Sequence, residues 1–447
     1  MRKIIAIFAM FIISIMPVNA NQIGKFLFSQ HMNTGDISVS IKDVETGNVV
    51  YALNDRSPRN PASTLKLLTS FASYETLGND YKFSTKLYKT DKNELYIKLG
   101  ADPFLTSKDL LALMKIAKAK NIVEPKTIYI DNTIFDSVEW GEGWQWDDDL
   151  NPCMPRFSAY NIDGNLINIE VTSQGKNIAP SIVTKPYYPV TFMNMVNPQS
   201  NINNVKLSRN NNISPNIINV TGTISTKQTL NIPVNNIQLY FNLRLEDAIR
   251  SAKIGYYSPF YIAKLPEKVY LAGEITHDIN QIMSSVLKDS NNLSAESLYK
   301  VAGSVYANDT GSTENSSRML YQYLSELNLN ISEIKVVDGS GVSKNNIMTS
   351  DFMTNFLLKL ANDENFGSLK EFMAVPGEGT LKNRMLYFKD NLIAKTGTLS
   401  DTSAIAGFIK TRKGKLYAFD IMIQGARTSD ADKKNIEEQI LRIIYTK

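Results

Sequence analysis

The spacing of apolar residues changes twice along the chain, and this change is the strongest constraint on its fold. Between about residues 85 and 260, short β-type runs such as 95–99 alternate with turn residues, and 197–237 is rich in Asn, Ser and β-branched residues. On either side, longer runs such as 276–288 and 432–445 have the 3.6-residue period of amphipathic helices. The sequence therefore predicts an α+β domain that is built from both ends of the chain and interrupted by a β-rich insertion.

The length of the chain agrees with this division, because 447 residues are too many for one ordinary core. We expect the domain formed by the two ends to comprise 21–86 and 262–447. The insertion is expected to form a second domain from 87–169 and 236–261, with a nested β-rich domain at 170–235.

The first twenty residues have the pattern of a secretory signal. Arg2 and Lys3 precede the apolar run 4–15, which is followed by the segment Val-Asn-Ala. The run is shorter than the about 20 residues of a membrane-spanning helix. We therefore expect a signal peptide at 1–20, cleaved before Asn21, and no spanning segment in the mature chain.

Composition argues against several classes of function. A net charge of +4 gives no nucleic-acid-binding footprint. The two histidines, His31 and His277, leave little for a His-based metal site, and neither accompanies a Gly-x-Ser-x-Gly motif, so serine chemistry here needs another base. We place His277 at the start of a helix. The single cysteine, Cys153, excludes an intramolecular disulfide, and we expect it to be a small buried residue.

Three short motifs occur in a fixed order along the chain. They are Ser63-Thr64-Leu65-Lys66, Ser290-Asn291-Asn292 and Lys395-Thr396-Gly397-Thr398. This Ser-x-x-Lys, Ser-x-Asn, Lys-Thr-Gly order is the one found in penicillin-binding proteins and class A β-lactamases. Each motif must be weighed by its context, because the first two are short enough to recur elsewhere in the chain.

The Ser63 motif differs from the other Ser-x-x-Lys sequences in its position. That pattern also begins at Ser173, Ser285, Ser297 and Ser332. Ser63 opens a predicted helix over 63–77 directly after Pro61-Ala62, where backbone N–H groups and the helix dipole favour negative charge. Lys66 lies three residues later and hence on the same helix face. A partly desolvated lysine near other cations can lose its proton and act as a base.

The other two motifs differ in how specific they are. Ser-x-Asn recurs at 214–216 and 343–345, but Ser290 lies on a loop between two predicted helices. Lys-Thr-Gly occurs once, after the apolar run 392–394, which predicts a strand. An edge strand here could pair with a peptide, and Gly397 would let a substrate backbone approach closely.

Taken together, the motifs carry a resemblance to a known family. The chain resembles the class C, type-4 low-molecular-mass penicillin-binding proteins, the S13 family of D-alanyl-D-alanine carboxypeptidases and endopeptidases, over nearly the whole mature chain. From Lys66 to Ser290 there are 290 − 66 = 224 residues, whereas class A β-lactamases have no room for inserted domains at this point. The segments that also match are 61–66, 143–148, 338–343 and 377–381.

The resemblance implies a fold and a set of roles. The fold is the serine β-lactamase/transpeptidase-like one, an antiparallel sheet with flanking helices, here interrupted by β-rich inserted domains. Ser63 attacks the carbonyl of the penultimate D-Ala and Lys66 takes its proton. Ser290 relays a proton to the leaving D-Ala, while Asn292 orients Lys66 and the substrate amide. Water then hydrolyses the acyl-enzyme, and no metal or organic cofactor is needed.

Substrate binding is assigned by the same resemblance to the third motif and to one acidic residue. Lys395 supplies positive charge for the substrate carboxylate, with the hydroxyls of Thr396 and Thr398, beside Gly397. The backbone N–H groups of Ser63 and Thr398 form the oxyanion hole. Asp148 reaches the amine end of the peptide, with its neighbours Asp147 and Asp149 as alternatives. Relatives often have Arg at the position of Lys344, and lysine cannot replace its bidentate carboxylate contact.

The sequence thus predicts a penicillin-sensitive serine D-Ala-D-Ala carboxypeptidase, D,D-endopeptidase, or both, in the periplasm or cell envelope. Its expected partners are peptidoglycan stem peptides and cross-links, with β-lactams as covalent inhibitors. Two alternatives stay open: a serine β-lactamase, and a non-catalytic peptidoglycan-binding protein. Carboxypeptidase and endopeptidase activity cannot be separated, because both cleave beside a D-residue.

Overall fold

The computed structural model describes residues 18–30, 33–198, 201–209, 214, 216–256, 259–425 and 428–446. The predicted signal peptide therefore lies outside the described residues up to position 17, and residues 18–20 begin helix α1 (Val18–Ser29). His31 also lies outside them. Within the described part of the chain, no helix is both long and apolar enough to cross a membrane.

A five-stranded antiparallel sheet joins the two ends of the chain, with the strand order β14-β15-β16-β1-β2. Its strands are β1 (Ile37–Asp43), β2 (Val49–Leu53), β14 (Leu392–Thr398), β15 (Thr402–Lys410) and β16 (Leu416–Gln424). β1 pairs with β16 from Ile37↔Ile423 to Asp43↔Tyr417. The strand with the Lys-Thr-Gly motif, β14, is an edge strand, as the sequence predicts.

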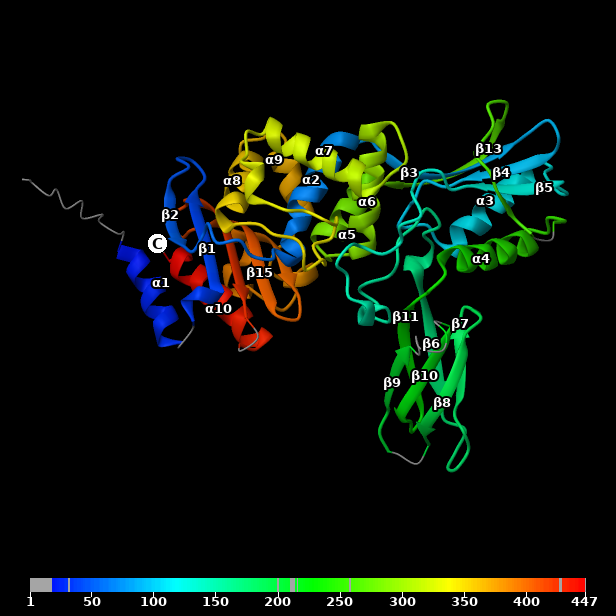
Figure 1. Ribbon diagram of the computed structural model, residues 1–447, viewed down its shortest axis with the longest axis horizontal. Coiled ribbons are helices and arrows are strands. Elements are labelled where there is room, and N and C mark those ends of the chain that lie inside the picture. Colours follow the sequence, from blue (N-terminus) through cyan, green and yellow to red (C-terminus); the bar gives the residue numbers. More distant parts are fainter. Residues whose placement is uncertain are drawn as a thin grey trace, which may run out of the picture.

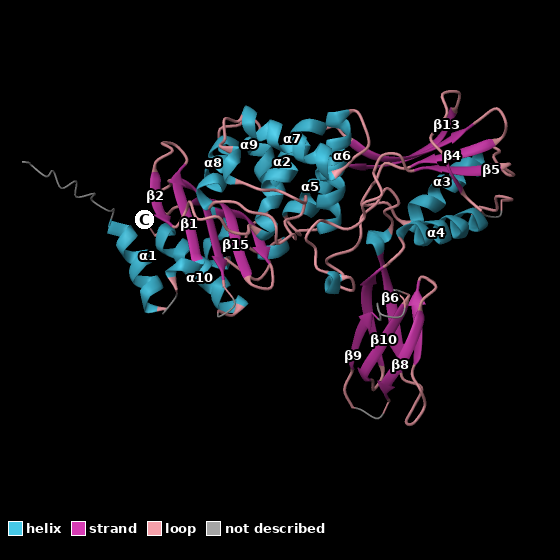
Figure 2. Cartoon of the chain, in the orientation of Figure 1, coloured by secondary structure: helices cyan, strands magenta, loops and turns pink. Residues whose placement is uncertain are grey.

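Helices cover both faces of this sheet (Figures 1 and 2). One face packs against α1 and α10, and Ile421 and Ile440 belong to that core. The other face packs against α8 and α2, where Leu68, Phe352 and Phe408 share a second core. The helices of this domain are α2 (Lys66–Leu77), α5 (Ile279–Leu287), α6 (Asn292–Ala307), α7 (Thr313–Glu326), α8 (Ser350–Ala361), α9 (Phe366–Leu369) and α10 (Asp430–Tyr445).

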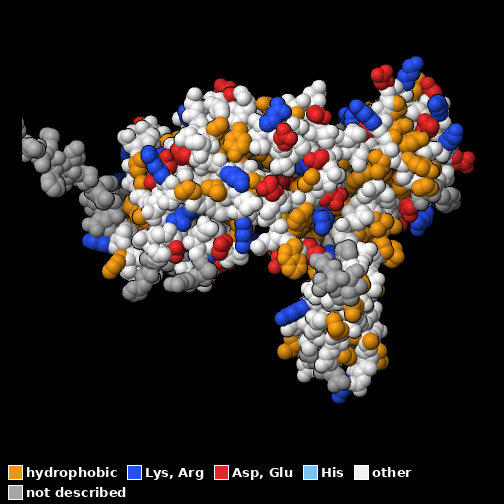
Figure 3. All heavy atoms as spheres, viewed as in Figure 1, with side chains coloured by type: hydrophobic (Ala, Val, Ile, Leu, Met, Phe, Trp, Pro, Cys, Tyr) orange, Lys and Arg blue, Asp and Glu red, His pale blue; other side chains and the backbone are white. Residues whose placement is uncertain are grey.

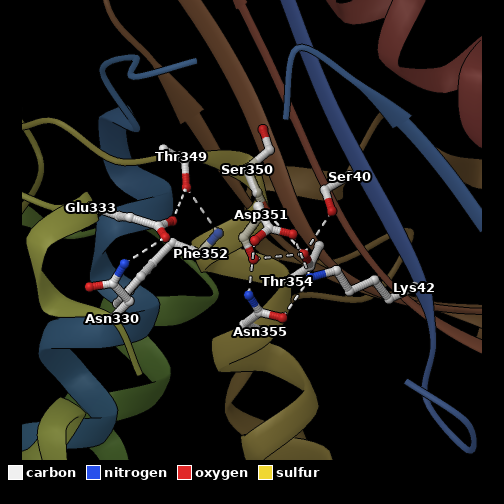
Figure 4. Close-up of polar contacts among 10 residues, drawn as sticks. All are labelled: Ser40, Lys42, Asn330, Glu333, Thr349, Ser350, Asp351, Phe352, Thr354 and Asn355. Carbon is white, nitrogen blue, oxygen red and sulfur yellow. Dashed lines mark hydrogen bonds and ion pairs between the residues drawn. The ribbon is translucent and has the colours of Figure 1, made fainter. Parts of the chain in front are cut away.

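Polar side chains fix α8 on the sheet (Figure 4). Ser40 Oγ lies 2.7 Å from Thr354 Oγ1. Lys42 Nζ donates to Asp351 Oδ1 at 2.6 Å and to Asn355 Oδ1 at 2.5 Å. Because a buried ammonium must be paired, these contacts specify how α8 lies across β1. This is the antiparallel sheet with flanking helices that the sequence predicts, and the fold class is confirmed.

The insertion contains a second five-stranded sheet, of order β12-β5-β4-β3-β13, which is packed against two helices (Figure 1). Its elements are β3 (Lys82–Lys89), β4 (Glu94–Lys98), α3 (Ser107–Ala119), β5 (Thr127–Asp131), α4 (Ile237–Ser251), β12 (Tyr261–Ile262) and β13 (Tyr270–Asp278). Leu87, Ile97 and Ile128 from the sheet and Leu113 from α3 are fully buried in its core.

A smaller β-rich lobe projects from this domain, as Figures 1 and 2 show. It consists of two three-stranded sheets, β8-β10-β9 and β11-β6-β7. Its strands are β6 (Leu166–Thr172), β7 (Ser181–Lys185), β8 (Thr191–Asn197), β9 (Asn204–Arg209), β10 (Ile217–Thr223) and β11 (Lys227–Pro233). Val171, Ile218 and Val220 fill the space between the sheets.

The outer domain is the one formed by the two ends of the chain, predicted to comprise 21–86 and 262–447. Strand pairing places two segments of this prediction in the insertion instead. β3 pairs with β13 from Lys82↔Asp278 to Tyr270↔Lys89, so 82–86 and 262–278 belong to the inserted sheet. The helix expected from 276 begins only at Ile279, with Asp278 as its N-cap. His277 is consequently a strand residue rather than a helix-start residue, and its Nδ1 lies 2.6 Å from Asp102 Oδ2.

Candidate active site

Ser63 lies in a short 3₁₀ helix, Ala62–Leu65, that leads directly into α2. The expected helix over 63–77 is therefore split, with its α-helical part starting at Lys66. Ala62 has φ +47°, a region that residues other than glycine rarely adopt and that is often found at functional sites. Asn60 Oδ1 accepts the Ala62 N–H at 2.8 Å and so helps to hold this turn.

Lys66 is fully buried beneath this turn and makes three contacts through one nitrogen. Its Nζ lies 2.9 Å from Ser63 Oγ, 2.7 Å from Asn292 Oδ1 and 2.5 Å from the carbonyl oxygen of Ser340. A neutral amine has two N–H bonds and one lone pair. Asn292 Oδ1 and the Ser340 carbonyl oxygen can only accept, so they would take the two N–H bonds. The lone pair would then face the Ser63 hydroxyl.

Burial lowers the pKa of Lys66 to about 7, although the nearby carboxylates of Asp338 and Glu296 favour its charged form. Both carboxylates hold backbone N–H groups of one loop. Asp338 accepts from Gly341 N at 2.8 Å, and Glu296 accepts from Ser340 N at 2.8 Å. An amine with this pKa is a base at neutral pH, which an exposed lysine is not.

The second motif lies where α5 ends and α6 begins. Ser290 has φ +62° and is partly exposed. Asn291 caps α6 by accepting Ser294 N at 2.9 Å. Asn292 bonds Lys66 through Oδ1 and donates through Nδ2 to the Cys153 carbonyl at 2.7 Å. The structure thus brings Ser63, Lys66 and Asn292 into one hydrogen-bonded group.

The loop before Ser290 is supported by the matching segment 377–381. Thr380 N donates to the Lys288 carbonyl at 2.9 Å, and Lys288 Nζ lies 3.3 Å from Glu378 Oε2. A Cβ on Gly379 would lie 2.2 Å from the same carbonyl oxygen, so only glycine permits this approach. The segment 377–381 therefore holds Lys288, two residues before Ser290, in place.

The third motif lies on β14, against the turn that carries Ser63. Lys395 is fully buried, and its Nζ donates to the Thr396 carbonyl at 2.7 Å. Burial and the charge of Lys66 hold the pKa of Lys395 well below its usual value. A Cβ on Gly397 would lie 2.9 Å from Ser63 N. The glycine expected to admit a substrate backbone thus also admits the backbone of the Ser63 turn.

An open cleft of about 370 Å³ lies above these motifs. Ser63, Asn292 and Thr398 line it from the outer domain. The other lining residues are Gln145, Asp148, Asn151, Cys153, Met154, Val342, Lys344, Leu399, Ser400 and Asp430. One wall therefore comes from the inserted segment, and this segment contributes the predicted Asp148.

Of the three neighbouring carboxylates, Asp148 is the one that lines the cleft. Asp149 instead pairs with Arg209 at 2.5 Å, and Asp147 does not line the cleft. Burial and the adjacent Asp147 raise the pKa of Asp148, while Asn151 and Lys344 oppose the rise. Asp148 and Lys344 thus bring one charge of each sign to the cleft, the first from the insertion and the second from the domain formed by the chain ends.

The sequence analysis missed Glu296, gave no role to Trp144 although the matching segment 143–148 contains it, and misplaced Cys153. Glu296 follows Asn292 by one helical turn, which is the only local sign that it shares the site. Trp144 Nε1 donates to Asp338 Oδ2 at 2.9 Å, which ties the insertion to the loop beside Lys66, and no local pattern predicts this contact. Cys153 was expected to be buried, but it is exposed and lines the cleft, because its loop follows the cleft wall.

The fold and the Ser–Lys pair together define a protein of the serine β-lactamase/transpeptidase-like class. Within this class, a family model described as D-Ala-D-Ala carboxypeptidase 3 (S13) matches residues 19–447. The chain belongs to this family, which confirms the resemblance noted in the sequence.

Two curated relatives are D-alanyl-D-alanine carboxypeptidases. That of Haemophilus influenzae, DacB, is 24% identical, over 88% of this chain and 86% of its own. That of Actinomadura sp. strain R39 is 25% identical, over 87% of this chain and 77% of its own. The crystal structure of penicillin binding protein 4 (dacB) from Haemophilus influenzae superposes with a TM-score of 0.85 at 22% identity, covering 96% of this chain and 100% of that one.

Proposed function

We propose that this protein is a penicillin-sensitive D-Ala-D-Ala peptidase that cleaves peptidoglycan peptides through an acyl-enzyme on Ser63. The observation that carries the proposal is the contact of 2.9 Å between Ser63 Oγ and the buried Lys66 Nζ. A serine hydroxyl is a weak nucleophile until a base removes its proton. A buried amine, with both N–H bonds engaged by Asn292 and Ser340, is placed to be that base.

Acylation follows from this arrangement. Lys66 takes the Ser63 proton as Oγ attacks the carbonyl of the penultimate D-Ala. The backbone N–H groups of Ser63 and Thr398 stabilise the oxyanion, a contribution of about 10²–10³ in rate for each donor. Ser290 passes a proton to the leaving D-Ala amine, and water then hydrolyses the ester. A β-lactam ring replaces the peptide bond in the same first step.

Substrate binding involves the third motif and the inserted wall. Lys395 is poorly solvated in the free protein, and a bound carboxylate would favour its charged form, aided by the Thr396 and Thr398 hydroxyls. Asp148 meets a cationic group of the stem peptide from the other side of the cleft. Secretion through a signal cleaved before Asn21 would bring the enzyme to its substrate in the periplasm or cell envelope.

The direct test is digestion of purified muropeptides by the mature chain, with monomeric pentapeptides and cross-linked dimers as separate substrates. Release of D-Ala from monomers identifies carboxypeptidase activity, and conversion of dimers to monomers identifies endopeptidase activity. Both should stop after covalent modification by penicillin. Rapid multiple turnover of a chromogenic cephalosporin, with no product from either muropeptide, would contradict the proposal in favour of a β-lactamase.

The rate of acylation should depend on pH through Lys66. Because its pKa is lowered to about 7, the amine is protonated and inactive as a base below this pH and free above it. The rate of labelling by a fluorescent penicillin should therefore fall about tenfold per pH unit on the acid side and reach a plateau above neutrality. A rate that stays flat from about pH 5 to about pH 8 would exclude Lys66 as the base.

A further inference from the structure

Glu296 is a fully buried carboxylate that the mechanism above does not use. It lies in α6, one turn beyond Asn292. Its two oxygens accept the Gly339 N–H at 3.0 and 3.1 Å, and Oε1 accepts the Ser340 N–H at 2.8 Å. Asp338 accepts the next N–H, that of Gly341, at 2.8 Å. Three successive backbone donors of one loop are thus held by two carboxylates.

The carbonyl groups of the same loop point to the helix that carries Lys66. The Ser340 carbonyl accepts from Lys66 Nζ at 2.5 Å, and the Gly339 carbonyl accepts from Thr69 Oγ1 at 2.7 Å. The loop therefore forms a bridge from Glu296 to Lys66. Without Glu296, two buried N–H groups would have no partner, and the direction of the Ser340 carbonyl would no longer be fixed.

The ionisable groups that surround Lys66 come from three other elements. Glu296 on α6 and Asp338 in the loop favour the ammonium form of Lys66, and its positive charge in turn lowers the pKa of Lys395 on β14. Tyr299, also on α6, faces Glu296, and burial together with that carboxylate raises its pKa well above the usual value, so it stays neutral. Burial and the charge of Asp338 raise the pKa of Glu296 itself to about 7, so its carboxylate is charged, and opposes deprotonation of Lys66, from about neutral pH upward.

We propose that Glu296 is a positioning residue with two separable effects on Lys66. Through the loop, it holds the Ser340 carbonyl where it orients the amine toward Ser63. Through its charge, it sets the pH above which Lys66 acts as a base. The inference rests on the proposed function, because its readout is the acylation of Ser63.

Two variants separate these effects. Glu296→Gln removes the charge and leaves a single acceptor oxygen for the two N–H groups. Glu296→Asp keeps the charge but is one methylene shorter, so it loses the reach. Glu437→Gln is the matched control, because Glu437 is also a fully buried glutamate, bonded to Arg384 and Ser403, but belongs to α10 on the opposite face of the sheet.

The experiment measures the rate of labelling by a fluorescent penicillin from about pH 5 to about pH 9 in each variant. For Glu296→Gln, the plateau of the labelling rate at high pH falls, and the acid limb, the side of the pH profile where the rate declines, moves to lower pH. Because Glu296 is itself protonated on the acid side, the shift should be largest near neutral pH, where the rate, taken as a fraction of the plateau, should rise up to about twofold over that of the wild type. For Glu296→Asp, the plateau falls but the limb stays in place. The Glu437→Gln limb is also unmoved.

The outcomes discriminate among the explanations. A lowered plateau with an unmoved limb in Glu296→Gln overturns the role of the charge and leaves Glu296 a structural residue. An unchanged plateau in Glu296→Asp overturns the positioning role, and this variant decides that point even where the Gln variant does not fold. If the wild type itself is not labelled at any pH, the proposed function fails, and this result is distinguishable from failure of the inference.

Discussion

The Ser63→Ala variant should lose covalent labelling by a fluorescent penicillin, with the acylation rate reduced by about 10⁴-fold or more. Alanine has no Oγ, so no ester can form. The fold should survive, because Ser63 is only partly buried and, among the described residues, its hydroxyl forms hydrogen bonds only with Lys66 Nζ at 2.9 Å and the Ser340 carbonyl at 3.5 Å. Losing such contacts costs about 1 kcal/mol of stability.

The chain offers a matched control for this substitution. Ser332 begins another Ser-x-x-Lys sequence and is exposed, and within the part of the chain that the structure describes its hydroxyl donates only to Asn330 Oδ1. The Ser332→Ala variant should be labelled at the wild-type rate. Labelling is followed by gel fluorescence and by the mass of the intact protein, and folding by the melting temperature. A Ser63→Ala protein that still gains the mass of the β-lactam would show that another residue is the nucleophile.

The relation of sequence to fold shows where local patterns stop being informative. The interrupted α+β architecture follows from periodicity, and the edge position of β14 agrees with its motif. The border of the insertion cannot be predicted from periodicity, because β3 and β13 pair across nearly two hundred residues of sequence, from Lys82↔Asp278 onward. Their apolar residues alternate as in any strand, and nothing local tells which sheet a strand will join.

The same limit applies to the site. The three-residue spacing of Ser63 and Lys66 predicts that the two side chains share a face, and they do. Their electrostatic setting depends on Glu296, which is buried beside a loop more than forty residues away in the sequence. The exposure of Cys153 likewise depends on where the inserted loop lies, not on the residue type.

The insertion contributes to the site and is not merely attached beside it. Trp144 bonds Asp338, and the Cys153 carbonyl bonds Asn292. Asp338 and Asn292 both interact with Lys66 as well, the first through its charge and the second through a hydrogen bond. The orientation of Lys66 thus depends on segments of the insertion and of the domain formed by the chain ends. The role of the insertion is therefore not limited to binding substrate.

The second large effect is expected from Gly397→Ala. The added Cβ would lie 2.9 Å from Ser63 N, 3.0 Å from the Ala62 Cβ and 3.0 Å from the Pro61 carbonyl oxygen. These atoms belong to the backbone or to a side chain with no freedom to turn aside, so either β14 or the Ser63 turn must shift. Because a displacement of about 1 Å can cost 100-fold in rate, acylation should fall about tenfold to a hundredfold.

A control variant shows whether the loss at Gly397 comes from the close contact with the Ser63 turn or from adding a methyl group anywhere in the protein. Gly367 in α9 has no atom within 4 Å of an added Cβ, so Gly367→Ala should leave the labelling rate unchanged. The overpacking at Gly397 should also destabilise the fold by about 1–3 kcal/mol, measured by denaturant unfolding. If Gly397→Ala is labelled as fast as Gly367→Ala, the close contact of β14 with the Ser63 turn is not what aligns the nucleophile. The glycine would then serve only the approach of the substrate.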